Sequence, residues 1–279
     1  MKMKKNIILV MLFLTPFVWG QKAEKIKGSK IVTIEKKEIG DFESIEVGNN
    51  IEVFLEKGEK SELKIEADDN LQSVIKIDLI DNILRLNTNK TVVNFKKLIL
   101  RITYTERLNL IVSKNESIVN ALQEIQLDDI TFKSFNESKL NLNVNSRNFL
   151  LQSDDKSKIE LNLKSENTTI ELSKNAALKA LIATIDLKSD LYQKAKASLE
   201  GDASNAVIRL DNNSDFMAQK LIIKNCDLTT EGYSNCSINS NSNLSIDASA
   251  NSEVKIYGNQ KIEIKRFVDS ATLVKKPTK

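Results

Sequence analysis

Hydrophobic and polar residues alternate in short runs along most of the chain, as in residues 139–144 and 158–163. Strict alternation of this length predicts strands that bury one face. A small Ser-containing segment precedes each run in the middle of the chain. These segments begin at positions 113, 134, 153 and 173, so successive starts differ by 21, 19 and 20. A nearly constant period of about twenty residues, with strand alternation inside it, predicts an all-β, right-handed parallel β-helix-like solenoid with short strands.

Strand patterns also occupy the region before the repeat. Residues 51–55 and 63–67 alternate on either side of a turn at Gly58, and residues 71–75 fit a short helical turn. Two later segments, 118–127 and 176–187, have sequences that could also form helices. Their β-branched residues favour strands, so we expect them to belong to the solenoid.

The corners of the predicted solenoid contain very little glycine. The chain has 8 Gly and 2 Pro, with no Gly between Glu59 and Glu200, but it has 29 Asn. Asn and Asp tolerate the left-handed backbone region better than other residues with a side chain. We therefore expect equivalent corner positions, stacked as a ladder, at Asn115, Asn136, Asp155 and Asn175. Compositional bias would explain the abundance of Asn but not its spacing.

The two ends of the chain carry different signals. Residues 1–20 have a basic start, an apolar run and small residues before a cleavage point after Gly20, which predicts a signal peptide. The alternative is a membrane anchor, for which the run is short. We expect a linker at 21–37, one solenoid domain at 38–272 and a tail at 273–279. No later run is apolar enough to cross a membrane, so the mature chain is expected to have no transmembrane segment.

Cys226 and Cys236 are the two cysteines of the chain. In an oxidising compartment they could form a disulfide. A separation of ten residues is about half a turn of the predicted solenoid, which would place them on opposite walls, too far apart to bond. A disulfide and two buried free thiols therefore both remain open at this stage.

The composition argues against several kinds of chemistry. The net charge is +3, with acidic and basic residues interspersed and no basic stripe for nucleic acid. There is no histidine, which excludes a Ser-His-Asp triad and a His-based zinc site. We expect no catalytic, cofactor-binding or metal-binding residues. Carboxylate pairs could serve glycoside cleavage, but Asp is also an ordinary turn residue. The pairs are Asp68-Asp69, Asp128-Asp129 and Asp154-Asp155.

Several segments together resemble a known family. The strand pair 42–47 and 51–55, the run 63–71, and the closing segment 254–259 with its Tyr257-Gly258 step are similar to the head GIN domain family. This family of putative auto-transporter adhesins is common in exported proteins of Bacteroidetes. Gly201-Asp202-Ala203-Ser204 resembles its small-residue repeat, and the Ser-x-Asn-x-Ser segments resemble further copies with Asn in place of Gly. The resemblance implies a parallel β-helix-like fold and an envelope or surface location.

These observations predict an exported, non-enzymatic β-solenoid that binds a partner in the cell envelope. The partner would be a surface glycan or an envelope protein, and the location the periplasm, the outer-membrane surface or the extracellular space. One alternative is a polysaccharide-active enzyme that uses carboxylates such as Asp128 and Asp154. Another is a structural envelope protein that self-associates through its end coils.

Overall fold

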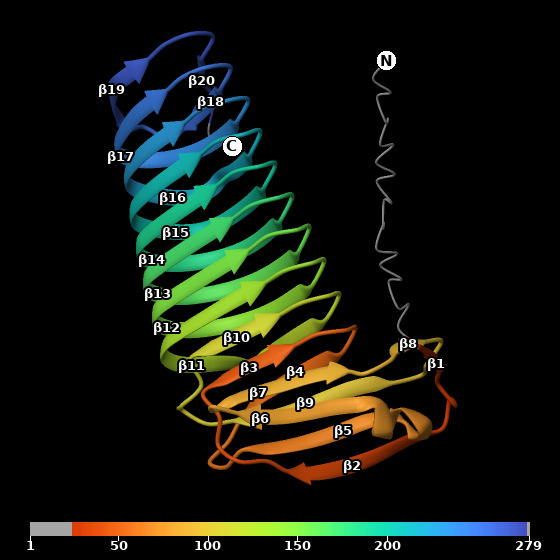
Figure 1. The fold of residues 1–279 in the computed structure, drawn as a ribbon. Coiled ribbons are helices and arrows are strands. Elements are labelled where there is room, and N and C mark those ends of the chain that lie inside the picture. The colour runs from red at the N-terminus through yellow and green to blue at the C-terminus, as the bar shows by residue number, and fades with distance from the viewer. Residues whose placement is uncertain (1–23, 278–279) are drawn as a thin grey trace, which may run out of the picture.

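The computed structural model describes residues 24–277 and shows a parallel β-solenoid standing on a mixed β cap (Figure 1). The predicted signal peptide lies outside the described residues. Each middle turn is one long strand that bends halfway along. These strands are β11 (Ile118–Ser134), β12 (Lys139–Ser153), β13 (Lys158–Leu172), β14 (Ala177–Leu191), β15 (Lys196–Leu210), β16 (Asp215–Thr230) and β17 (Asn235–Ala248), and the short β10 (Leu110–Ser113) pairs with the second half of β11.

The pairing register confirms the predicted period. Lys139 lies beside Lys158, and Lys158 lies beside Ala177, so equivalent positions in these neighbouring turns differ by 19 in residue number. Strands β11–β17 are 14–17 residues long, more than the short strands expected, because their hydrogen bonds continue around the bend. The segments 118–127 and 176–187 are strands, as the β-branched residues favoured.

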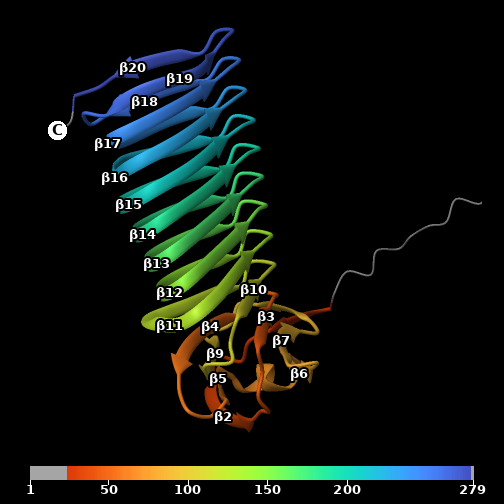
Figure 2. The same ribbon diagram turned by 90° about the vertical axis from the view of Figure 1, so that its left-hand side faces the viewer.

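Each bend divides a turn between two parallel sheets. We call residues equivalent to 139–144 the leading sheet, because they follow a tight corner, and those equivalent to 148–153 the trailing sheet. Leu140, Val144 and Phe149 are at most 2% exposed and fill the space between the sheets. Figure 2 shows the tight corners stacked along one side of the solenoid and the wide bends along the other.

The N-terminal cap is built out of sequence order. β3 (Ser44–Val47) and β4 (Glu52–Lys57) pair with β10 and β11 in the trailing and leading sheets. The turn beyond them is made by later residues, since β7 (Ile83–Thr88) pairs with β3 and β9 (Leu98–Tyr104) pairs with β4. In the cap, strands from later in the sequence (β7 and β9) therefore lie outside strands from earlier in the sequence (β3 and β4).

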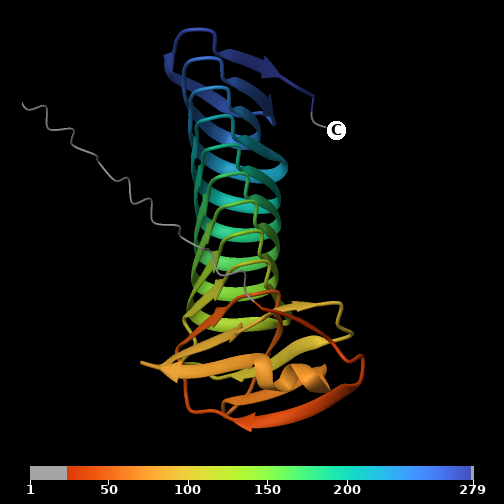
Figure 3. The same ribbon diagram turned by 45° about the vertical axis from the view of Figure 1, so that its right-hand side comes forward.

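Antiparallel strands close this end of both sheets. β6 (Ile75–Ile80) pairs with β7, while β5 (Glu62–Asp68) pairs with β9 and then with β2 (Val32–Glu38). The 3-10 helix η1 (Asp69–Val74) lies where a short helical turn was expected, and its Leu71 is fully buried. Figure 3 shows the cap lying across the lower end of the stack.

The region expected to be a linker contains two strands within its described part. β1 (Lys25–Lys27) pairs with β8 (Thr91–Val93), and most of β2 falls before residue 38. The pairing partners lie far along the sequence, so residues 21–37 alone do not reveal them. At the other end, β18 (Glu253–Tyr257), β19 (Lys261–Phe267) and β20 (Thr272–Lys275) form the last turns.

Candidate binding surface

The tight corners are built from two successive residues in the left-handed region. Asn115 and Glu116 have φ of 52° and 63°, and Ser117 donates its backbone N–H to the carbonyl of Lys114 across them. A pair of positive φ values is the geometry of a type I′ turn, in which Asn is favoured. Asn136 and Asp155, with φ of 53° and 47°, occupy the same first position in the next two turns.

Asn175 differs from the other three predicted corner residues by one position. It has φ of 65°, but Lys174 before it, with φ of 45°, takes the place equivalent to Asn115. The backbone confirms this offset, because Lys156 N–H donates to Lys174 O as Glu116 N–H does to Asn136 O. The segment starts at positions 153 and 173 differ by one more than the structural repeat, which accounts for the shift.

Side-chain amides link part of the corner column. Asn136 Nδ2 donates to Asn115 Oδ1 at 2.9 Å, and Asn115 Nδ2 donates to Asn49 Oδ1 at 3.4 Å. The later corners use charge instead, with Lys174 Nζ lying 3.5 Å from Asp155 Oδ2. The amide ladder therefore covers only the turns nearest the cap.

Gly201-Asp202-Ala203-Ser204 is not a tight corner. Gly201 lies within β15, beside Ile182, where the chain approaches the wide bend. Its φ is +110°, and a Cβ there would overlap the carbonyl oxygen of Ile182. Glycine is therefore needed here because the backbones of neighbouring turns come close together. The tight corner of that repeat lies at Gln193 and Lys194.

A longer amide ladder runs along the outer face of the trailing sheet. Its asparagines donate to the residue of the turn before at 2.6–3.1 Å, in two runs that each begin at an accepting carboxylate, Asp129 or Asp186. The column contains Asp129, Asn148, Asn167, Asp186, Asn205, Asn225 and Asn243. These residues recur once in every turn, and that spacing could have pointed to the column from the sequence. Nothing in the sequence alone shows that they share a face.

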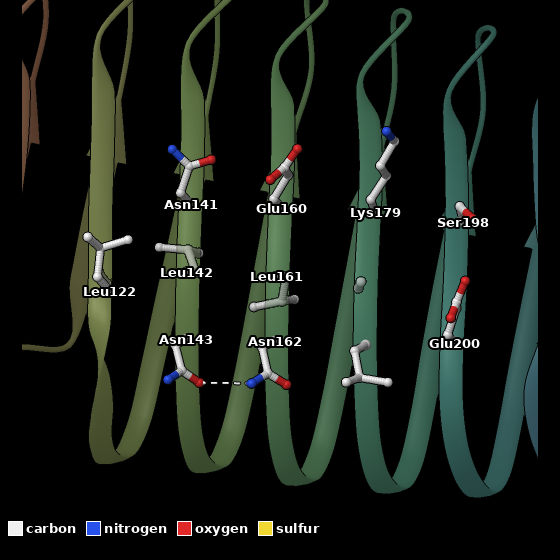
Figure 4. Close-up of a pocket in the computed structure, with 13 residues that line it drawn as sticks. Leu122, Asn141, Leu142, Asn143, Glu160, Leu161, Asn162, Lys179, Ser198 and Glu200 are labelled. Atoms are coloured by element: carbon white, nitrogen blue, oxygen red, sulfur yellow. Dashed lines mark hydrogen bonds between the residues drawn. The ribbon is translucent and has the colours of Figure 1, made fainter.

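A shallow groove crosses the outer face of the leading sheet from β11 to β15 (Figure 4). One wall contains Asn141, Glu160 and Lys179 in neighbouring turns, and the floor lies over the backbone at Leu142, Leu161 and Ala180. The other wall contains Leu122, Asn143, Asn162, Leu181 and Glu200. The groove runs along the solenoid axis, so it meets one new turn about every 4.8 Å.

The groove walls combine fixed amides with two exposed leucines. Asn162 Nδ2 donates to Asn143 Oδ1 at 3.2 Å, and Asn141 Nδ2 donates to Asn120 Oδ1 at 2.7 Å. Leu122 and Leu181 face solvent and are 70% and 54% exposed, so two apolar side chains stand where the other wall residues are polar. The sequence analysis did not identify this groove, because its residues come from five turns.

The three candidate carboxylate pairs lie in different parts of the fold, and the first of them, Asp68-Asp69, lies in the cap. Asp68 is buried and accepts backbone N–H groups of Lys30, Lys96 and Lys97 at 2.9–3.1 Å. Burial opposes its ionisation, but these hydrogen bonds outweigh burial and lower the pKa of Asp68. Asp68 therefore fastens the cap together, which is a structural role.

The other two pairs lie at opposite ends of the trailing sheet. Asp129 lies at the start of the trailing-sheet half of β11, in register with Asn148 of β12. Asp154 lies just after the end of β12. Six residues of extended chain separate Asn148 from Asp154, a distance of roughly 20 Å. Glycosidase carboxyl groups lie no more than about 9.5 Å apart. Asp128 and Asp154 are therefore not brought together.

An ion cluster in the cap surrounds the carboxylate of Glu66. Glu66, with its side chain 9% exposed, accepts Arg101 Nε at 3.0 Å and lies 3.3 Å from the Nζ atoms of Lys64 and Lys97. The hydrogen bond from Arg101, supported by the two lysines, lowers the pKa of Glu66 from 4.5 to about 2. The cluster joins β5 to β9, and its Arg101 lies in register with Phe54 of β4, the strand that pairs with β11.

Cys226 and Cys236 are both free and buried. Cys226 lies in the trailing sheet beside Ala206, and Cys236 lies in the leading sheet beside Phe216. They therefore stand on opposite walls of the core, as the half-turn spacing suggested. Burial raises the pKa of both thiols.

Residues 24–277 contain no group of three or more Cys, Asp or Glu side chains placed to hold a metal ion. Over the same residues, no helix has the length and apolar character needed to span a membrane.

The fold and its outer faces define the class of protein as a parallel β-solenoid with a mixed β cap. Residues 41–259 match the family described as putative auto-transporter adhesin, head GIN domain. The chain belongs to this family, and the resemblance carried by its sequence motifs is confirmed. No curated protein matches the chain.

Solved structures share the fold. A putative adhesin from Parabacteroides merdae has a TM-score of 0.66 at 19% identity, covering 91% of this chain and all of its own. A putative adhesin from Parabacteroides distasonis gives 0.66 at 16% identity, covering 91% of this chain and 100% of that one. A putative lipid binding protein from the same species gives 0.59 at 12%, covering 90% and 97%. At these identities the likeness concerns the fold alone.

Proposed function

We propose that this protein is an exported, non-enzymatic solenoid that binds a glycan of the cell envelope or surface through the groove on its leading sheet. The observation that carries the proposal is the groove itself, which crosses five successive turns from β11 to β15. An extended ligand lying in it would meet side chains at equivalent positions in every turn, although their type changes from turn to turn. Membership of the adhesin family supports a binding role at the surface.

The chemistry of the groove walls suits a hydroxyl-rich chain. Amide and carboxylate groups both accept hydrogen bonds from sugar hydroxyls, and amides and Lys179 also donate. Asn143 and Asn162 are held by their mutual hydrogen bond, so little side-chain entropy is lost when a ligand binds. The exposed Leu122 and Leu181 offer apolar contact for the C–H faces of sugar rings.

The separation of the carboxylate pairs supports binding rather than cleavage. Asp128 and Asp154 stand at opposite ends of a sheet, and Asp68 is occupied by backbone hydrogen bonds. Glu160 and Glu200 in the groove belong to strands β13 and β15, with β14 between them, at roughly 10 Å from strand to strand.

A glycan array with the mature chain tests this function directly. We expect a hit whose affinity falls at least tenfold in Asn162→Arg, which fills the groove with a long side chain. Thr169→Arg, which faces outward on the trailing sheet, is the matched control and should bind normally. Binding to envelope proteins alone, equal loss in both variants, or release of shorter products from the glycan would contradict the proposal.

Export has its own test, because residues 1–20 lie outside the described structure. Expression of the full chain followed by cell fractionation should place it in the envelope or medium, shortened by about 20 residues as the sequence predicts. A matched chain lacking residues 1–20 should stay in the cytoplasm. Recovery of the full chain unprocessed in the cytoplasm would count against export.

A further inference from the structure

The last turn of the solenoid, at its C-terminal end, exposes apolar side chains at positions that are buried in the core in the turn before it. Ile262, Ile264 and Phe267 of β19 are 39%, 52% and 40% exposed. Their register partners in β17 are Leu244, Ile246 and Ala248, which are at most 1% exposed. The last turn therefore continues the inward apolar pattern, but no described residue covers it.

Both sheets present an open edge at this end. β19 pairs only with β17, and β20 pairs only with β18 among the described strands. The top of the stack in Figure 1 shows these last strands, whereas the opposite end is closed by η1 and antiparallel strands. An open edge together with uncovered core residues is the feature that pairs with another chain.

A second copy of this chain fits the open end geometrically. A two-fold axis perpendicular to the sheets reverses strand direction while keeping each sheet in its own plane. It therefore places β19 antiparallel to β19 of the second copy, and β20 antiparallel to β20. Antiparallel pairing is compatible with a flat continuation of each sheet, and the two exposed ends of the core then cover one another.

The charges of β19 are also self-complementary. Residues 261–265 read Lys-Ile-Glu-Ile-Lys, with the isoleucines directed inward and the charged residues outward. A two-fold axis centred on Ile262 places Glu263 opposite Lys261 of the second copy. An axis centred on Ile264 places Glu263 opposite Lys265. Lysine on an edge strand usually discourages pairing, but each register places Glu263 opposite one lysine, Lys261 in the first and Lys265 in the second.

Existing ion pairs do not prevent this arrangement. Lys265 Nζ lies 3.4 Å from Asp227 Oδ1, but both side chains are more than half exposed, so the pair is weak. Arg266 is held by Asp247 at 2.7 Å and lies outside the Lys-Ile-Glu-Ile-Lys segment. The segment is thus available to a second chain.

We infer that the protein forms a tail-to-tail dimer, in which β19 of one copy pairs antiparallel with β19 of a second copy to make one continuous double-length solenoid. The groove on the leading sheet remains open on both halves. This assembly is independent of the proposed ligand, because it uses the last turn rather than β11–β15.

Sedimentation of the mature chain over a range of concentrations measures this association. We expect a reversible monomer–dimer equilibrium. Glu263→Lys places lysine opposite lysine and should raise the dimer dissociation constant about tenfold or more. The combined Lys261→Glu and Lys265→Glu variant should do the same through facing glutamates. Glu35→Lys on β2, the exposed strand at the other end, is the matched control and should dimerise normally.

Mixing the two β19 variants separates pairing from misfolding. An equimolar mixture joins a lysine-bearing edge to a glutamate-bearing edge, so we expect a heterodimer at least as stable as the wild-type dimer. Circular dichroism checks that each variant is folded. A wild-type monomer at all concentrations, a dimer unaffected by the β19 variants, or a mixture that stays monomeric while both variants are folded would overturn the inference.

Discussion

The side-chain amide of Asn136 donates to Asn115 Oδ1 at 2.9 Å, and the two residues have nearly identical left-handed φ values of 53° and 52°. One residue type thus serves two purposes at the corner. Its backbone adopts the conformation that the tight turn requires, and its side chain joins successive turns. This relationship explains how the chain turns with so little glycine.

Replacement of Asn136 by valine should destabilise the protein by about 1–3 kcal/mol, because a β-branched residue is strained at positive φ and the hydrogen bond to Asn115 is lost. Chemical denaturation measures the free energy of unfolding. Asn136→Gly is the matched variant, since glycine keeps the backbone conformation and loses only the hydrogen bond. Equal stability of the valine and glycine variants would show that φ is not the determinant.

Gly201→Ala should cost about 1–3 kcal/mol, because the backbone at φ +110° is strained for alanine and the added Cβ would meet Ile182 O in the neighbouring turn. Gly48→Ala is the control, since a Cβ there would meet only Lys114 O, at 4.0 Å. Thermal unfolding of both variants provides the comparison. A Gly201→Ala protein as stable as the Gly48→Ala protein would contradict the close approach.

Stability should depend on pH through Glu66. Its pKa is lowered in the folded state to about 2, so its contribution is fully present above about pH 5 and is lost as the pH falls through about 2. The contribution is at most about 3 kcal/mol. Denaturation from pH 6 to pH 2 should show wild type and Glu66→Gln converging as the pH falls. Glu35→Gln, an exposed carboxylate on β2, should follow wild type throughout; a gap between wild type and Glu66→Gln that does not narrow would refute this role.

Cys226 and Cys236 should be unreactive in the native protein. Both thiols are buried, and burial raises their pKa values, so little thiolate forms near neutral pH. Alkylation followed by mass measurement should add no label to the folded chain and two labels in denaturant. Two labels that appear only after reduction would instead reveal a disulfide between the sheets.

Much of the solenoid body follows from local sequence. The alternation in 139–144 and 158–163 identifies which side chains face the core, and the Ser-containing segments place the corners. The prediction for Asn115, Asn136 and Asp155 rests on one physical property, tolerance of positive φ. Asn175 lies one position away from the equivalent corner because Lys174 occupies the first left-handed position, and side-chain preference alone does not exclude lysine there.

The cap and the binding surface depend on contacts that sequence reasoning could not supply. β7 and β9 lie beyond β3 and β4 although they follow them in sequence, and β2 pairs with a strand thirty residues later. The groove brings Asn143 next to Asn162 only because these two positions are one turn apart in the register of β12 and β13. A shift of one residue would send those amides to the other face.

The sequence by itself determined that this chain is a repeating all-β structure with asparagine at its corners, since period, alternation and backbone preference are local properties. The tertiary structure alone decided how the cap is interleaved, which outward residues form columns, and that the last turn leaves its core uncovered. Those features depend on the register between turns and on which strands lack a neighbour, and both are set by long-range pairing rather than by any single segment.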